Sequence, residues 1–263
     1  MLSFYHTHHC KNIIAENLPL GRKKWSLQTI ILLSDKEVIK ELTKEYRLMF
    51  QGKNIDDFDL CYNRQYFTPD HQRYNEMSSS MVLAAEFGKI EVVDEILSLS
   101  KDVNMFFCNM SMRAAAKNGH IEIVDKMLAL GATYYDSAMI SAAENGRIEI
   151  VNKMLALGAN DYNRSMVSAA RNGQIEIVDK MIALGANNYA TVMAAAANNG
   201  YIEIVDKMLA LGANNYYASL YCALNYDHIE IANKLLELDY DNIKTISFKN
   251  PHHHKIITFL QTK

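Results

Sequence analysis

One short phrase, NGHIEIVDKMLALGA (118–132), returns almost unchanged along the chain, and each copy begins 27 residues after the one before it. The copies begin at Asn118, Asn145, Asn172 and Asn199. A fixed period of 20 to 50 residues is typical of a stacked array, in which each repeat buries its apolar surface against its neighbours. The phrase therefore excludes a single closed core for this part of the chain and predicts a solenoid.

Two columns of glycine divide each repeat into two helical stretches. Residues 148–157 gather their apolar side chains on an arc wide enough for a helix that is covered on two sides. Residues 136–145 place two alanines on one side, which lets a neighbouring helix approach closely. Gly146 suits the turn between these helices, and Gly158 suits the left-handed residue that ends the second one. The sequence predicts antiparallel helix pairs with short loops.

The same frame extends on both sides of the four close copies. Residues 81–100 fit it with a longer loop, and in the last repeat Asp227 and Asp239 replace the two glycines. Asp tolerates a left-handed backbone at a cost on the order of 1 kcal/mol, so we expect both to adopt it. We expect three parts: a helical or irregular N-terminal capping region (1–75), six repeats (76–240) and a C-terminal half-repeat cap (241–263) whose HHHKIITFLQ forms a second helix.

Columns that do not vary between copies are interpreted as structural. On the second helix, Glu149 and Lys153 have the i, i+4 spacing of a helical ion pair, which predicts a solvated outer face. The methionines at the positions of Met139 and Met154 are predicted to lie in the core. A tyrosine column in the loops is predicted to pack against the next repeat, and a base-stacking ladder is disfavoured because no basic stripe accompanies it. Its members are Tyr135, Tyr162, Tyr189 and Tyr216.

The string AAKNGHIEIVDKMLALGA (115–132) resembles the second half of an ankyrin repeat, in register over more than half of the chain. Ankyrin repeats normally take about 33 residues and include a β-hairpin finger and a Thr-Pro-Leu-His tetrapeptide. Here RSMV (164–167) replaces the tetrapeptide, and no proline occurs between Pro69 and Pro251. The resemblance, without the finger, implies an all-α, ankyrin-like helical solenoid of stacked antiparallel helix pairs with little or no β-hairpin. Short-loop arrays of this composition resemble those of large DNA viruses of protists.

The ankyrin resemblance implies a non-enzymatic module that binds a protein partner on the concave surface of its first helices. Positions that vary while the frame holds lie on the polar side of the first helix and just after its turn, whereas the exposed Glu and Lys of the second helix do not vary. We therefore predict a partner-binding stripe rich in Arg and Tyr, the residue types enriched in interface hot spots. Its residues are Arg147, Arg164, Arg171, Gln174, Asn198, Tyr201 and Tyr217.

Catalytic and cofactor motifs are missing from the sequence, which has no Walker loop, H-E-x-x-H or G-x-S-x-G. We expect no cofactor and no metal, because HTHHC (6–10) and HHH (252–254) lie at opposite ends of an elongated array. A net charge of −3 offers no footprint for nucleic acid, and no apolar run is long enough for a membrane span. Cysteines without paired spacing favour a cytoplasmic location, the host cytoplasm for a viral protein.

Two alternatives remain open. In one, the chain is a structural component that self-associates through its solenoid ends. The polar KNPHHHK (249–255) argues against this reading and for a monomer. In the other, residues 1–75 hold an unrecognised enzyme, although they carry no catalytic constellation.

Overall fold

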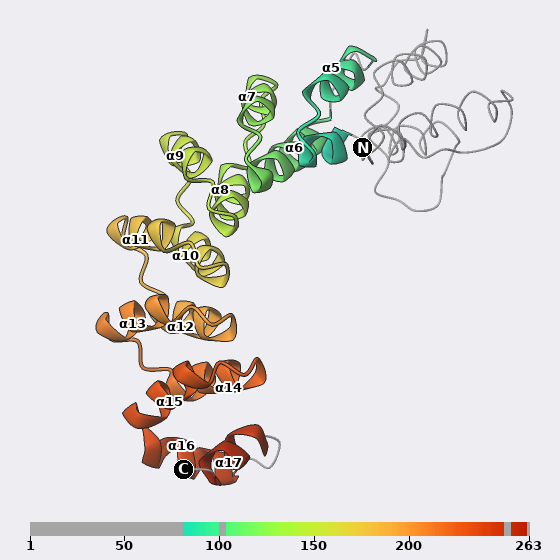
Figure 1. Ribbon diagram of the computed structural model, residues 1–263. Coiled ribbons are helices and arrows are strands. Elements are labelled where there is room, and N and C mark those ends of the chain that lie inside the picture. The colour runs from blue at the N-terminus through green and yellow to red at the C-terminus, as the bar shows by residue number, and fades with distance from the viewer. Residues whose placement is uncertain (1–80, 100–103, 250–253, 262–263) are drawn as a thin grey trace, which may run out of the picture. The chain divides into compact units, whose positions relative to one another are not determined.

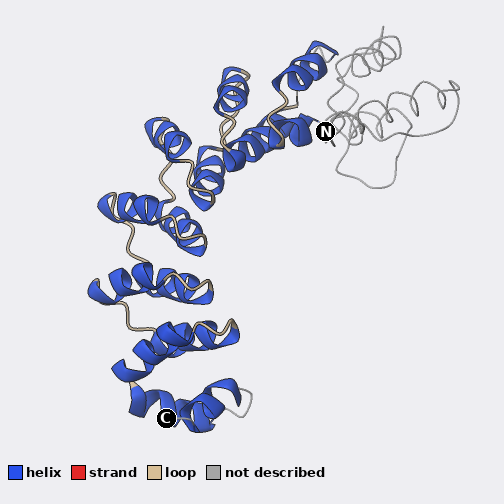
Figure 2. Ribbon diagram, in the orientation of Figure 1, coloured by secondary structure: helices blue, strands red, loops and turns tan. Residues whose placement is uncertain are grey.

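The computed structural model describes residues 81–99, 104–249 and 254–261. The chain divides into two compact units, residues 1–133 and 134–263. Every regular element in the described ranges is a helix, and loops connect the helices without any strand (Figure 2). The predicted all-α solenoid of helix pairs with short loops is therefore confirmed.

The first unit contains two helix pairs within its described residues. Residues 81–86 are helical and are followed by α5 (Ile90–Leu99). The second pair is α6 (Met105–Asn118) with α7 (Ile121–Ala129), and α7 also packs against α5. Helix α6 has 14 residues, whereas the first helices of the later repeats have 10. Asn104 caps its start, since the Asn104 side chain accepts a hydrogen bond from the backbone N–H of Phe106 (2.8 Å).

The second unit stacks four repeats and a terminal helix pair, which follow one another in the order shown in Figure 1. Its first helices are α8 (Tyr135–Glu144), α10 (Tyr162–Arg171), α12 (Tyr189–Asn198) and α14 (Tyr216–Asn225). Its second helices are α9 (Ile148–Ala156), α11 (Ile175–Ala183), α13 (Ile202–Ala210) and α15 (Ile229–Leu238). The terminal pair is α16 (Tyr240–Lys249) with α17 (His254–Gln261). The bounds of α8, α9 and α17 follow the predicted helices closely, whereas α16 is a helix that the sequence analysis did not predict.

Small side chains explain why the first helices form the tight part of the stack. In α8, Met139, Ala142 and Ala143 are fully buried, and α10 packs against both α8 and α12. Alanine at the contact lets two helix axes approach closely. Each second helix packs mainly on its own first helix and buries residues such as Val151 and Met154. The methionine columns thus lie in the core, as predicted. Leu157 was predicted to lie on the apolar arc of residues 148–157, but it is 42% exposed.

Both glycine columns adopt the left-handed backbone that the sequence predicts. Gly146 has φ of 70° and Gly158 has φ of 98°. Around Gly146, the N–H of Arg147 reaches back to the carbonyl of Ala142 (2.9 Å), the bond that closes a Schellman motif. Asp227 is also left-handed, with φ of 59°.

Asp239 departs from the expected left-handed backbone and has an extended φ of −150°. The cause is the helix that follows directly, because α16 begins at Tyr240. The carbonyl of Asp239 accepts from the N–H of Ile243 (3.0 Å) and so belongs to the first turn of α16.

The tyrosine column lies at the starts of helices and not in the loops where it was predicted. These tyrosines, placed in the loops by sequence, are the first residues of α8, α10, α12 and α14 and are half-buried. The sequence misplaced them because short loops leave no separate turn signal before each first helix.

Candidate functional site

The predicted stripe residues lie in the second unit, on the first helices and in the turns that follow them. Arg164 and Arg171 lie on α10, and Arg147 lies in the turn between α8 and α9. All three arginines are exposed. Asn198 ends α12 and Tyr217 is the second residue of α14, and both are half-buried.

One of the three arginines forms an ion pair and the other two do not. Arg164 Nη1 donates to Asp161 Oδ2 (3.1 Å), yet its side chain remains 76% exposed. Within the described ranges, Arg147 and Arg171 have no ion-pair partner. Their guanidinium groups are therefore available to a carboxylate from another molecule.

Within each unit, a residue after a first-helix turn packs on the glycine of the preceding repeat, as Gln174, Tyr201 and His228 do in the second unit and His120 does in the first. A Cβ built on Gly173 would lie 2.4 Å from Tyr201 Cε1, and one built on Gly146 would lie 2.4 Å from Gln174 Oε1. His228 approaches Gly200 in the same way. In the first unit, His120 approaches Gly88 and its Nε2 lies 3.1 Å from the carbonyl oxygen of Glu86. Gln174 and Tyr201 thus fill space between repeats, a contact that the sequence analysis missed.

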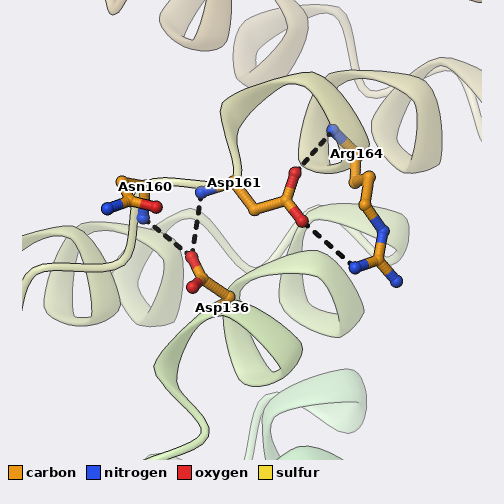
Figure 3. Close-up of polar contacts among 4 residues, drawn as sticks. All are labelled: Asp136, Asn160, Asp161 and Arg164. Atoms are coloured by element: carbon orange, nitrogen blue, oxygen red, sulfur yellow. Dashed lines mark hydrogen bonds and ion pairs between the residues drawn. The ribbon is translucent and has the colours of Figure 1, made fainter.

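Asx side chains hold the short loops that stand where a finger would be (Figure 3). Asp136 Oδ1 accepts hydrogen bonds from the backbone N–H groups of Asn160 (2.7 Å) and Asp161 (2.9 Å), 24 and 25 residues further on. Asp161 in turn accepts from the N–H of Arg164 (3.2 Å) and caps α10. The carboxylate of one first helix thereby positions the start of the next.

The same clamp occurs in two other repeats. Asn163 Oδ1 accepts from the N–H groups of Asn187 (2.9 Å) and Asn188 (3.0 Å). In the first unit, Asn109 accepts from the N–H of Thr133 (2.8 Å). The column ends with Ala190 and Tyr217, whose side chains offer no amide or carboxylate oxygen. The predicted stripe residue Tyr217 therefore occupies a clamp position.

The second-helix face is linked by ion pairs between repeats. Lys207 pairs with Asp179 and Lys234 pairs with Asp206, while Lys126 pairs with Asp94 in the first unit. These lysines bridge to the preceding repeat and not to the glutamate of their own helix, which corrects the predicted i, i+4 pairing. In α9 the acidic position is Asn152.

Reactive chemistry is not favoured by the surroundings of the two described cysteines. Burial raises the pKa of the Cys108 thiol and of the Cys222 thiol, so both stay protonated near neutral pH. No group of three or more His, Cys, Asp or Glu side chains in the described ranges could hold a metal ion. The HTHHC segment lies outside those ranges, as do His252 and His253 of the C-terminal cluster. None of the described helices combines the length and apolar character of a membrane span.

Comparisons with known proteins agree with the helix pairs. The family model described as ankyrin repeats (3 copies) matches residues 81–166 and again 166–246, which is more than half of the chain. The ankyrin repeat domain of human ASB11 is similar in structure, with a TM-score of 0.47 and 20% sequence identity over 60% of this chain and 82% of that one. No curated protein matches the sequence. The chain belongs to the ankyrin repeat family, whose members generally mediate protein–protein interactions.

Proposed function

We propose that this protein is a non-enzymatic interaction module that binds another protein along the first-helix face of its second unit. The observation that carries the proposal is the contrast between its two faces. Exposed positions on the first helices change from repeat to repeat, as in Arg164 of α10 and Thr191 of α12. Exposed positions on the second helices keep the same Glu, and Lys207 and Lys234 are used in ion pairs between repeats.

Each proposed contact residue has a role that suits its surroundings. Arg147 and Arg171 supply exposed guanidinium groups for carboxylates of the partner. Tyr217 supplies an aromatic surface of low conformational entropy. Gln174 and Tyr201 keep half-exposed outer edges while their inner sides pack on glycine. Arg164 and Asn198 complete the set.

Affinity capture from native host cells, followed by mass spectrometry, tests this proposal. The first variant combines Arg164→Ala, Arg171→Ala and Tyr201→Ala. Because Tyr201 packs on Gly173, a second variant replaces Arg147, Arg164 and Arg171 by alanine and keeps the Tyr201 contact with Gly173 in place. The matched control replaces Glu149, Glu176 and Glu203 by alanine, since these glutamates are exposed on the second helices. Both arginine variants are expected to lose the partner and the control to retain it. Full capture by the all-arginine variant would refute the proposal.

The alternative to this function is a structural component that self-associates through its solenoid ends. We propose a monomer that works in a reducing, cytoplasmic compartment. Sedimentation velocity over a concentration series is expected to give one monomeric species, whereas growth of the sedimentation coefficient with concentration would favour the assembly function.

A further inference from the structure

The first-helix face of the second unit is divided into a charged part and an uncharged part. Helices α8 and α10 carry four charged residues between them. Helices α12 and α14 carry none themselves, and the charges beside them include Asp227 in the turn after α14 and Lys255, which donates to the carbonyls of Leu224 and Asn225. The part formed by α12 and α14 is called the uncharged part because its helices carry no charged side chain. The boundary falls between the second and third repeats of this unit, so a ligand that crosses the face meets two different chemistries.

The charged part presents more positive than negative charge to solvent, although its formal charges balance. Asp136 directs a carboxylate oxygen into two backbone N–H bonds, and Asp161 caps α10 with only 26% of its side chain exposed. The guanidinium of Arg164, by contrast, is on a side chain that is 76% exposed. Arg147 and Arg171 are exposed and lack ion-pair partners in the described part of the chain. The remaining carboxylate of these two helices, that of Glu144, is half-buried.

The uncharged part is dominated by tyrosine. Tyr221 on α14 is 37% exposed, and Tyr226 in the turn after α14 is 61% exposed. Tyr217 on α14 and Tyr201 in the turn after α12 are half-buried. Tyrosine rings bury a large area with few rotatable bonds, which makes them effective anchors for apolar and aromatic side chains.

We propose that the partner docks here through an extended protein segment in which a cluster of Asp or Glu lies beside a cluster of apolar residues. The acidic cluster contacts Arg147 and Arg171, and the apolar cluster contacts Tyr217, Tyr221 and Tyr226. This inference rests on the proposed function and adds the chemistry of the partner to it. Arginine pairs with carboxylates through two parallel hydrogen bonds, so acidic side chains fit the exposed guanidinium groups.

A single-stranded polynucleotide fits this face less well. Tyrosine and arginine together can stack and neutralise nucleotides, but a phosphate on every nucleotide needs cations along the whole path. The first helices α12 and α14 offer no Lys or Arg. Lys255 of α17 brings one cation to the end of α14, where it donates to the carbonyls of Leu224 and Asn225, and Asp227 adds an exposed carboxylate in the turn after α14. Cations therefore do not follow the whole face, and a protein segment with one acidic cluster fits it better.

Selection of random linear peptides on the full-length protein tests this inference. The selected sequences are expected to hold Asp or Glu at one end and apolar residues at the other. Arg171→Glu is expected to weaken the binding of a selected peptide by about tenfold at low salt, because a charge reversal removes an attraction and adds a repulsion. Tyr221→Ala is expected to weaken it through lost apolar contact. Lys180→Glu makes the same charge change on the second helix α11 and is expected to leave affinity unchanged.

Each remaining outcome overturns the inference, and the outcomes separate it from the proposed function. Peptides without an acidic preference that still lose affinity in the Tyr221 variant overturn the acidic segment and keep the first-helix face. Peptides insensitive to both first-helix variants overturn the proposed function as well. Failure to select any peptide overturns a linear segment as the ligand. Tighter binding of oligouridylate than of any selected peptide assigns the face to nucleic acid and overturns the proposal.

Discussion

Replacing Gly173 by alanine tests whether the residue after each turn holds neighbouring repeats together. Gly173 has φ of 72°, and a Cβ there would lie 2.4 Å from Tyr201 Cε1 and 2.7 Å from Cδ1. Gly185, later in the same repeat, has φ of 97° with no atom within 4 Å of its Cβ position. Both substitutions strain a left-handed backbone, but only Gly173→Ala also displaces a neighbouring side chain.

The two terms give different totals for the free energy of unfolding. An L-residue in the left-handed region costs about 1–2 kcal/mol, so Gly185→Ala should destabilise by about that amount. Overpacking adds about 1–3 kcal/mol, so Gly173→Ala should cost about 2–5 kcal/mol. Backbone strain by itself predicts the opposite order, because φ of 97° at Gly185 lies further from the left-handed minimum than φ of 72° at Gly173.

Urea unfolding followed by far-UV circular dichroism measures both costs, and a double-mutant cycle isolates the contact. With Tyr201→Ala in place, Gly173→Ala should cost no more than Gly185→Ala. If Gly173→Ala costs the same with and without the Tyr201 ring, the contact does not hold the repeats together and the argument fails.

Two further predictions concern links between repeats. The carboxylate introduced by Asn152→Asp should pair with Lys180 as Asp179 pairs with Lys207, and should stabilise the protein by about 0.2–1 kcal/mol at low salt. Asn152→Ala is the control and should give no gain in stability. A gain from Asn152→Asp that persists in molar salt would contradict the ion pair. Asn163→Ala removes the acceptor of two exposed backbone N–H groups and should cost about 0.5–1.5 kcal/mol by urea unfolding, because water can replace the lost acceptor. Ala190→Asn in the same column should be stabilising, and equal effects of the two changes would argue against the clamp.

The helices and their ends could be predicted from the sequence because their causes are local. Apolar spacing defines α9, and Gly146 and Gly158 mark the left-handed ends through a property of the residue itself. The burial of Met139 and Met154 followed from the same periodicity. Each of these features depends only on residues close to it in the sequence, and a single 27-residue repeat contains all of those residues.

Hydrogen bonds and ion pairs between repeats were not predicted, because they depend on how far each repeat is rotated and shifted from the last. Asp136 reaches Asn160 across 24 residues, and Lys207 reaches Asp179 across 28. A helix-based reading pairs Lys207 with Glu203 equally well, and local spacing does not decide between the two carboxylates. The column of Asp136 and Asn163 could have predicted the clamp, since side chains with an acceptor oxygen recur there every 27 residues.

The loss of the finger and the composition of the first-helix face are connected through the clamp column. A short loop leaves its backbone N–H groups in need of acceptors, and Asp136 and Asn163 supply them in the two repeats that carry Arg147, Arg164 and Arg171. In α12 and α14 the column becomes Ala190 and Tyr217, so no Asx clamp forms from those positions. The position released from that role in α14 holds a tyrosine on the uncharged part of the face. One column thus supplies a loop acceptor in α8 and α10 and a tyrosine in α14, and under the proposed function the loss of the clamp gives this position to the aromatic part of the face.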